Sequence, residues 1–175
     1  MTTKPPSGPQ ESGPPATDAQ EGRTRWLSQD EQVLWLELRD FVGGLPRAID
    51  RQLIQDAGMS GGEYAVLAAV SQAPPEGVRS GDLARVLDWE KSRVSHLLRR
   101  MEAKGLIARC SASTDGRGQE ITLTEEGWDM VRSTAPGHVT MVRETVFDPL
   151  TPTELGQLRS SLQKIRSAAV TRGLW

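Results

Sequence analysis

The residues with the clearest capacity for chemistry run from Trp89 to Leu106, in the sequence WEKSRVSHLLRRMEAKGL. Between positions 91 and 117 the chain has seven lysine and arginine residues against two acidic ones, a local net charge of +5 in a protein whose formal net charge is −2. A basic cluster of this kind is typical of a surface that binds phosphate groups, although a charge run alone is more often a solvated helix face. The arrangement of the cluster must therefore decide between these two interpretations.

The periodicity of this stretch predicts an amphipathic helix. Its apolar residues recur at i, i+3, i+4 and i+7, and they are Val94, Leu97, Leu98 and Met101. The opposite face then carries hydrogen-bond donors and positive charge, which suit the base edges and phosphates of a B-DNA major groove. We expect base contacts from the N-terminal half of this helix, at Ser92, Arg93, Ser95 and His96. We expect mainly phosphate contacts from Lys91, Arg99 and Arg100.

The flanking sequence predicts a helix-turn-helix followed by a hairpin. Ser80 is expected to cap a short helix, and Asp88 to cap the basic helix from Trp89 to Gly105. Two strands follow, at 106–110 and in the alternating sequence QEITLT, with the glycine-rich tip SASTDGRG between them. A hairpin in this position is a wing. Arg117 lies at its tip, where an arginine can enter a narrow A·T-rich minor groove, and we expect Asp115 to orient it.

Helices are also expected on both sides of this unit. Residues 1–24 hold five of the eleven prolines and indicate a disordered tail. Ser28 and Glu31 have the spacing of a capping box for a helix that reaches Gly58, with a bend or interruption at Gly43-Gly44 and Pro46. Ser60 and Thr124 are expected to cap two further helices. Pro136-Gly137 should kink or break the second of these, and Thr151-Pro152 should start the last helix.

The run from Asp82 to Gly127, DLARVLDWEKSRVSHLLRRMEAKGLIAR…STDGRGQEITLTEEG, resembles the MarR family of bacterial winged-helix regulators. The resemblance extends over about residues 28–172. It implies a mainly α fold with a small β wing, in which a winged helix at about 60–132 is flanked by dimerisation helices at about 28–57 and 136–172, within a domain of residues 25–175. It also implies recognition-helix roles for Ser92, Arg93, Ser95 and His96 and an Asp-x-Arg wing pair at Asp115 and Arg117. Many members have a second basic residue after that arginine, where this chain has Gly118.

A homodimer and an effector site are also expected. The first helix and the C-terminal pair of helices carry more apolar surface than a thin winged domain can bury, and the resemblance implies that they interlock around a two-fold axis. Family members often release DNA when a small aromatic or anionic molecule binds between the dimerisation helices and the winged domain. Trp35, Arg39 and His138 are the candidates for such a site, although a packed tryptophan and a surface arginine are the plainer interpretation.

The remaining chemistry argues against several other classes of protein. Ser95 and His96 are adjacent on the predicted helix and project about 100° apart, and no oxyanion loop or phosphate-cradling motif is present, so we expect no enzyme activity and no cofactor. One cysteine, Cys110, and two widely separated histidines predict no metal site. Without a membrane-length apolar run or a signal sequence, a cytoplasmic protein is expected. The sequence thus predicts a sequence-specific DNA-binding regulator that acts as a repressor. The alternative is a winged-helix module that binds protein instead of DNA.

Overall fold

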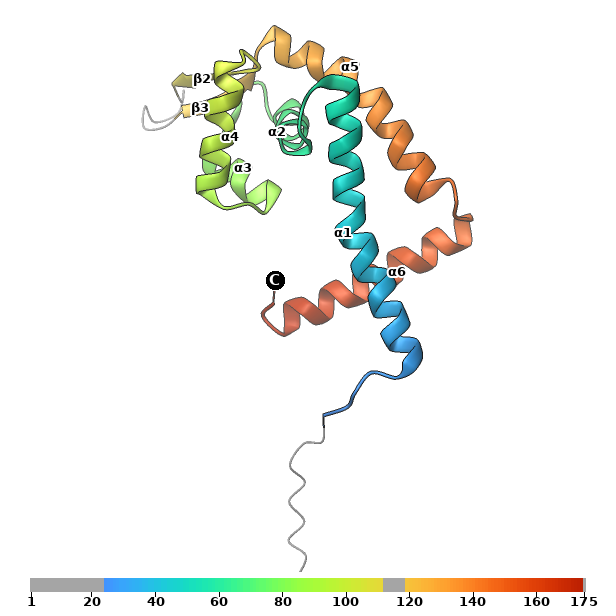
Figure 1. The fold of residues 1–175 in the computed structure, drawn as a ribbon. Coiled ribbons are helices and arrows are strands. Elements are labelled where there is room, and N and C mark those ends of the chain that lie inside the picture. Colours follow the sequence, from blue (N-terminus) through green and yellow to red (C-terminus); the bar gives the residue numbers. More distant parts are fainter. Residues whose placement is uncertain (1–23, 112–118, 175) are drawn as a thin grey trace, which may run out of the picture. The chain divides into compact units, whose positions relative to one another are not determined.

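The computed structural model describes residues 24–111 and 119–174. In this part of the chain, helices predominate and three short strands form one antiparallel sheet (Figure 1). The elements in chain order are α1 (Gln29–Ala57), α2 (Gly61–Ser71), β1 (Val78–Arg79), α3 (Ser80–Leu87), α4 (Lys91–Ala103), β2 (Ile107–Ser111), β3 (Gln119–Leu123), α5 (Glu125–Val142), the π-helical turn η1 (Arg143–Phe147) and α6 (Pro152–Thr171). The expected fold class, mainly α with a small β wing, is confirmed. The predicted tail lies outside the described residues except for Thr24.

The chain divides into two units between Leu38 and Arg39, inside α1. In the first unit, the predicted capping box is present. The Ser28 amide donates to Glu31 Oε2 at 2.8 Å, and the Glu31 amide donates to Ser28 Oγ at 3.2 Å. These two bonds satisfy amide groups that the first turn of a helix otherwise leaves without partners, so α1 begins where the sequence predicts.

The core of the second unit is the winged helix. Apolar side chains from the end of α1 and from α2, α3, α4 and the sheet form one buried cluster, which includes Leu53, Leu67, Leu83, Leu98 and Ile121. Residues Ile121 and Leu123 of β3 both face this cluster, as the alternation in QEITLT predicts. The β2–β3 hairpin therefore closes one side of the same core that the helix-turn-helix builds.

A third strand, β1, was not expected from the sequence. Val78 pairs with Ile121 and Arg79 with Glu120, so β3 lies between β1 and β2. Gly77 precedes this strand with a φ of 103°, and a Cβ atom there would lie 2.7 Å from the Ile121 carbonyl oxygen. Only glycine fits that close approach of two backbones, which sets β1 against β3.

The predicted N-caps of α3 and α4 are wrong by one and two residues, respectively. Arg79 is the N-cap of α3 and Ser80 its first residue, because the helix begins directly after β1. Asp88 has a left-handed backbone with a φ of 52° and is the C-cap of α3. The Trp89 amide also donates back to the Ala84 carbonyl, at 2.9 Å. The backbone at Asp88 and Trp89 therefore closes α3, and α4 starts at Lys91 after the N-cap Glu90.

The sequence predicts a bend or an interruption at Pro46 and a kink or a break at Pro136, and the interruption and the break are absent. Both α1 and α5 run on through their prolines, Pro46 and Pro136, as single helices. A proline costs about 3 kcal/mol in a helix interior, but tertiary packing supplies most of the stability of a helix in a protein. Leu53, beyond the first proline, is fully buried. The regular pattern of α5 changes only at η1, and the helical path reaches Phe147 as expected.

None of the helices in the described ranges, 24–111 and 119–174, has the length and apolar character that crossing a lipid bilayer requires.

Candidate nucleic-acid interface

Helix α4 has well-defined ends that fix which of its faces is exposed. At its start, the Val94 amide donates to the Glu90 carbonyl at 3.1 Å. At its end, Gly105 has a φ of 73° and its amide donates to the Glu102 carbonyl at 2.9 Å, while the Leu106 amide donates to the Met101 carbonyl at 3.0 Å. This pair of bonds is the Schellman closure that the sequence predicts. The chain therefore leaves α4 directly into β2, with the buried Leu106 at the junction.

The apolar stripe and the polar face of α4 lie as the periodicity predicts. Val94, Leu97, Leu98 and Met101 are all buried in the core. The predicted DNA-contacting residues of this helix are all exposed, and they are Lys91, Ser92, Arg93, Ser95, His96, Arg99 and Arg100. The structure thus brings hydroxyl, imidazole, guanidinium and ammonium groups to one solvent-facing surface of a single helix. Such a set can donate hydrogen bonds to base edges and to phosphates.

Two basic residues of the cluster serve the fold instead. Lys104 Nζ lies 2.6 Å from Oε1 of Glu63, whose side chain is only 8% exposed. Burial opposes ionisation of Glu63, but the bond from Lys104 and the two bonds from Ser60 outweigh it and hold the pKa of the carboxyl below its usual value. Arg109 Nε lies 3.0 Å from Glu102 Oε2 and its Nη1 donates to Gln119. The local charge of +5 therefore overstates what this region offers to a ligand.

The positive charge of the exposed α4 face has no such compensation. Within the described ranges, no carboxylate lies at ion-pair distance from Lys91, Arg93, Arg99 or Arg100. The Arg93 guanidinium lies over the Trp89 ring, 4.1 Å from its centroid. A cation–π contact of this kind orients the guanidinium without neutralising it. These four residues give the surface a positive electrostatic potential, which attracts an anionic polymer.

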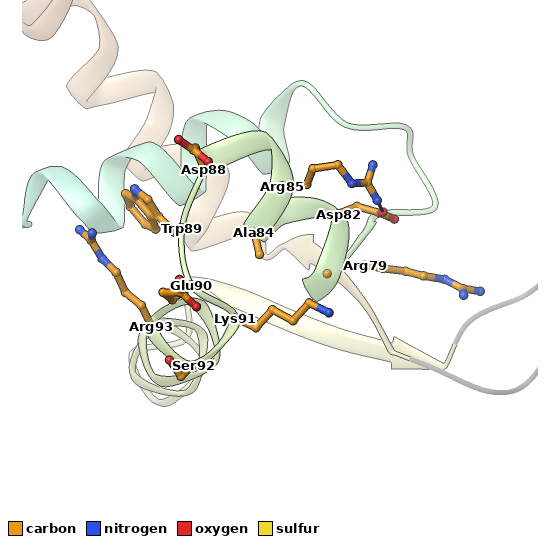
Figure 2. A pocket seen from close by; sticks show the side chains of 11 residues that line it. Arg79, Asp82, Ala84, Arg85, Asp88, Trp89, Glu90, Lys91, Ser92 and Arg93 are labelled. Atoms are coloured by element: carbon orange, nitrogen blue, oxygen red, sulfur yellow. Dashed lines mark hydrogen bonds and ion pairs between the residues drawn. The ribbon is translucent and has the colours of Figure 1, made fainter. Parts of the chain in front are cut away.

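A groove between α3 and the start of α4 adds residues that the sequence analysis missed (Figure 2). Arg79, Arg85 and Trp89 line it together with Lys91. Arg85 forms an ion pair with Asp82 one turn earlier on α3, so its charge is balanced. Figure 2 shows the Arg79 and Lys91 side chains extending in the same direction from the groove. Arg79 had no signal in the sequence because its position depends on β1, whose two residues are too few for a periodic pattern.

The two predicted wing residues, Asp115 and Arg117, lie outside the described residues, as does Gly118. The strands that carry the wing are in place. Ile107 pairs with Leu123 and Ser111 with Gln119 in an antiparallel register. The positions of the wing residues at the hairpin tip thus remain predictions from the sequence.

The predicted effector residues are each placed in a different setting. Trp35 belongs to the first unit and is 55% exposed. Arg39 Nη2 lies 3.8 Å from Asp40 Oδ1 on the exposed surface of the second unit. His138 is partly buried on α5, with its ring centroid 4.7 Å from that of Tyr64. Burial lowers the pKa of His138, so its neutral form is favoured, and its buried Nδ1 has no hydrogen-bond partner among the described residues.

Cys110 is exposed on β2. Over residues 24–111 and 119–174, histidine, cysteine and acidic side chains form no cluster that could hold a metal ion.

Comparison with known proteins gives this geometry its context. The sequence model of the MarR family matches residues 57–118, which include the whole of α4. The structure is similar to that of Sco3205 from Streptomyces coelicolor, a MarR family transcriptional regulator in complex with DNA. The two are 36% identical, with a TM-score of 0.77, and the match covers 84% of this chain and 92% of that one.

Of two further relatives, one has been solved with a bound small molecule and the other is named a transcriptional repressor. CouR from Rhodococcus jostii RHA1, solved with bound p-coumaroyl-CoA, is 28% identical with a TM-score of 0.64, over 79% of this chain and 95% of that one. The HTH-type transcriptional repressor Rv2887 of Mycobacterium tuberculosis is 27% identical over 141 residues, which are 81% of this chain and 98% of the repressor. Given the winged helix, the exposed basic face of α4 and the extent of the match to Sco3205, the chain belongs to the MarR family of DNA-binding transcriptional regulators.

Proposed function

We propose that the protein is a homodimeric repressor that binds a pseudo-palindromic operator and releases it in response to a small molecule. One observation carries the proposal: α4 buries its apolar stripe completely and exposes four uncompensated basic residues together with Ser92, Ser95 and His96. The second helix of a helix-turn-helix is the element that enters the major groove. The structure of Sco3205 with DNA and the name of the repressor Rv2887 support the same assignment.

The contacts divide into two kinds. Ser92, Arg93, Ser95 and His96 lie on the N-terminal half of α4, and we assign them to base edges. Lys91, Arg99 and Arg100 are assigned mainly to phosphates, which set the position of the helix but carry no sequence information. Arg117 enters the minor groove from the wing, and Asp115 orients it.

The apolar surface of the flanking helices supports a homodimer. In the helical part of the first unit, Val33, Leu34, Trp35 and Leu36 are exposed, and on α6 so are Leu158, Leu162 and Ile165. Apolar surface gathered on whole helices is typical of an interface. We assign residues of about 28–57 and 136–172 to dimerisation and about 60–132 to DNA binding. A two-fold axis would present two copies of α4 to half-sites about 34 Å apart.

We assign the effector to a chemical class and not to a particular compound. CouR has been solved with p-coumaroyl-CoA, a ligand with an aromatic ring and negative charge. Trp35, Arg39 and His138 remain the residues that we propose for an aromatic or anionic effector in this chain. Such a molecule changes DNA binding only if it has different affinities for the DNA-bound and free arrangements of the two recognition helices. A DNA partner also implies that the protein acts where the chromosome is, in the cytoplasm.

Selection of bound fragments from the source genome, followed by footprinting, tests the DNA-binding proposal. We expect a pseudo-palindromic site. His96→Ala should change the base preference at one position in each half-site, by about 1–3 kcal/mol, while Arg117→Ala should weaken binding to all sequences. Gln163→Ala on α6 serves as the control.

Equal retention of operator binding by the His96 and Arg117 variants at matched salt would reject the residue assignment. Duplex binding that does not change with salt would favour the alternative of a protein-binding winged helix, because phosphate contacts release counterions.

A further inference from the structure

A second basic groove adjoins the face of α4 that we assign to DNA. The first groove lies along α4 itself and is lined by His96, Arg99 and Arg100. The second lies between the C-terminal half of α1 and the start of α2, where Arg47 and Arg51 line it. Arg93, Asp50 and Gly62 line both grooves. The concave surface is therefore continuous from the recognition helix to α1, and all of these residues belong to the second unit.

The charge of the second groove is positive and uncompensated. Arg47 and Arg51 are one helical turn apart on α1 and both are exposed. In the described part of the chain, neither has a carboxylate at ion-pair distance, whereas Arg85, Arg109, Arg132 and Arg143 all do. The groove contains one acidic residue, Asp50, and its Oδ1 accepts the Gly61 amide at 2.7 Å. That carboxylate is thus committed to the start of α2, where the helix dipole favours a negative charge.

Trp89 holds the junction between the two grooves. A Cβ atom on Gly62 would lie 3.6 Å from Cη2 of Trp89, so the indole lies against the start of α2 in ordinary van der Waals contact. The Arg93 guanidinium lies over the same indole at 4.1 Å. The ring therefore holds a positive group in the lining that the two grooves share. Figure 2 shows Arg93 on the side of Trp89 away from Lys91.

We propose that Arg47 and Arg51 bind phosphates of the DNA backbone next to the segment of major groove that α4 enters. The proposal rests on the proposed function of α4. Guanidinium groups donate paired hydrogen bonds that match the oxygens of a phosphate, and the exposed stems of two arginines one turn apart can follow successive phosphates. The DNA-binding surface then extends from the winged helix onto α1. A change in the position of α1 would alter DNA affinity directly.

The test measures the salt dependence of DNA binding by the full-length protein. Binding to a random-sequence 30-base-pair duplex is followed by fluorescence anisotropy between about 50 and 200 mM salt, because phosphate contacts do not depend on sequence. The variant is Arg47→Gln with Arg51→Gln. The matched control is Arg23→Gln with Arg25→Gln, which removes the same number of charges from the sequence before α1. Circular dichroism and thermal unfolding check that both variants fold.

Each phosphate contact contributes about 0.9 to the slope of log affinity against log salt. The α1 variant removes four such contacts from the proposed homodimer, two in each copy. Over this fourfold change in salt, the affinity of the unaltered protein should therefore fall about 150-fold more than that of the α1 variant. The control should keep the slope of the unaltered protein.

An α1 variant with the unaltered slope would overturn the proposal, even if its affinity were lower. Binding of 2-naphthoate that is lost in the α1 variant, with no change in slope, would assign the groove to a small aromatic anion and would also overturn it. If the unaltered protein bound no duplex at any salt concentration, the proposed function would fail together with the inference. A lower slope in the α1 variant, together with the unaltered slope in the control, would support both.

Discussion

Helices α4 and α6 are both amphipathic, but the apolar face is buried in α4 and exposed in α6. The four apolar residues of the α4 stripe are all buried within the chain. On α6, three apolar residues at helical spacing, Leu158, Leu162 and Ile165, are between 42% and 52% exposed. The fold of the winged helix is therefore determined by a single copy of the chain. A helix that exposes its apolar side needs a surface from elsewhere, and we assign that surface to a second copy.

The largest effect should follow from a change to the buried stripe. Leu98 is fully buried at the centre of the core, so Leu98→Ala removes apolar contacts and leaves a cavity. We expect the free energy of unfolding to fall by about 2–5 kcal/mol, as measured by urea denaturation with circular dichroism. Leu158→Ala on α6 is the comparison at half-exposed surface. An equal loss in both variants at low protein concentration would remove the distinction between the two helices.

The next substitution should weaken the dimer and leave the winged helix intact. Leu162→Glu places a charge on the exposed apolar face of α6, where a partner copy would bury it. An unpaired buried charge costs several kcal/mol, so the dimer should dissociate about 100-fold more readily or more. Sedimentation equilibrium measures this change. Gln163→Glu adds the same charge to the next residue and should have a smaller effect, and a Leu162 variant as dimeric as the unaltered protein would reject α6 as an interface.

The same contrast explains what the sequence could and could not predict. The α4 stripe, the Gly105 closure and the alternation in β3 are local patterns, and the structure confirms all three. Asp88 was misassigned because its role depends on where α3 ends. The sequence left open whether the helices bend or stop at Pro46 and Pro136, because the local cost of a proline is visible in the sequence while the packing that offsets this cost is not.

The missed residues of the site have the same cause. Arg79 depends on pairing between β1 and β3, which are some forty residues apart in the chain and have no common periodicity. Arg47 and Arg51 are unremarkable in the sequence, and they become part of a basic groove only because α1 and α2 meet beside Trp89. Conversely, Lys104 was counted in the local net charge of +5, although it contacts Glu63, 41 residues earlier. Charge patterns predict a surface, but tertiary contacts determine which charges remain free.

The Lys104–Glu63 pair permits a pH-dependent test of that distinction. Lys104→Met leaves the buried Glu63 carboxylate with bonds from Ser60 only, so we expect a loss of about 1–3 kcal/mol at pH 7. The folded-state pKa of Glu63 is lowered, so its contribution to stability is complete above the usual carboxyl pKa of about 4.3 and is lost as pH falls through the lower folded value. The difference between the two proteins should therefore shrink below pH 4.

Urea denaturation at pH 7, 5 and 3.5 measures this convergence. Arg132→Met is the control, because Arg132 pairs with two exposed carboxylates on its own helix. Exposed pairs of this kind contribute little, so the control should change stability far less than Lys104→Met does. Lys104→Met with unaltered stability would show that Lys104 belongs with the solvated charges.

The smallest predicted effect compares two capping boxes with nearly the same geometry. The Ser60 amide donates to Glu63 at 2.9 Å and the Thr151 amide to Glu154 at 2.8 Å, while the return bond is 3.3 Å in both. The boxes differ in burial, because the first is partly buried between α1 and α4 and the second is exposed at the start of α6. Replacing an N-cap by alanine costs about 0.5–2 kcal/mol, and we expect Ser60→Ala at the upper end and Thr151→Ala at the lower end of this range.

Hydrogen exchange separates these two losses by location. Ser60→Ala should speed exchange throughout the winged helix, since α2 belongs to its cooperative core, whereas Thr151→Ala should act only on the first turns of α6. If Thr151→Ala also speeds exchange across the winged helix, α6 is coupled to that core within one chain. The partner copy would then no longer be needed to explain how the exposed face of α6 is stabilised, and the contrast with α4 would be one of degree.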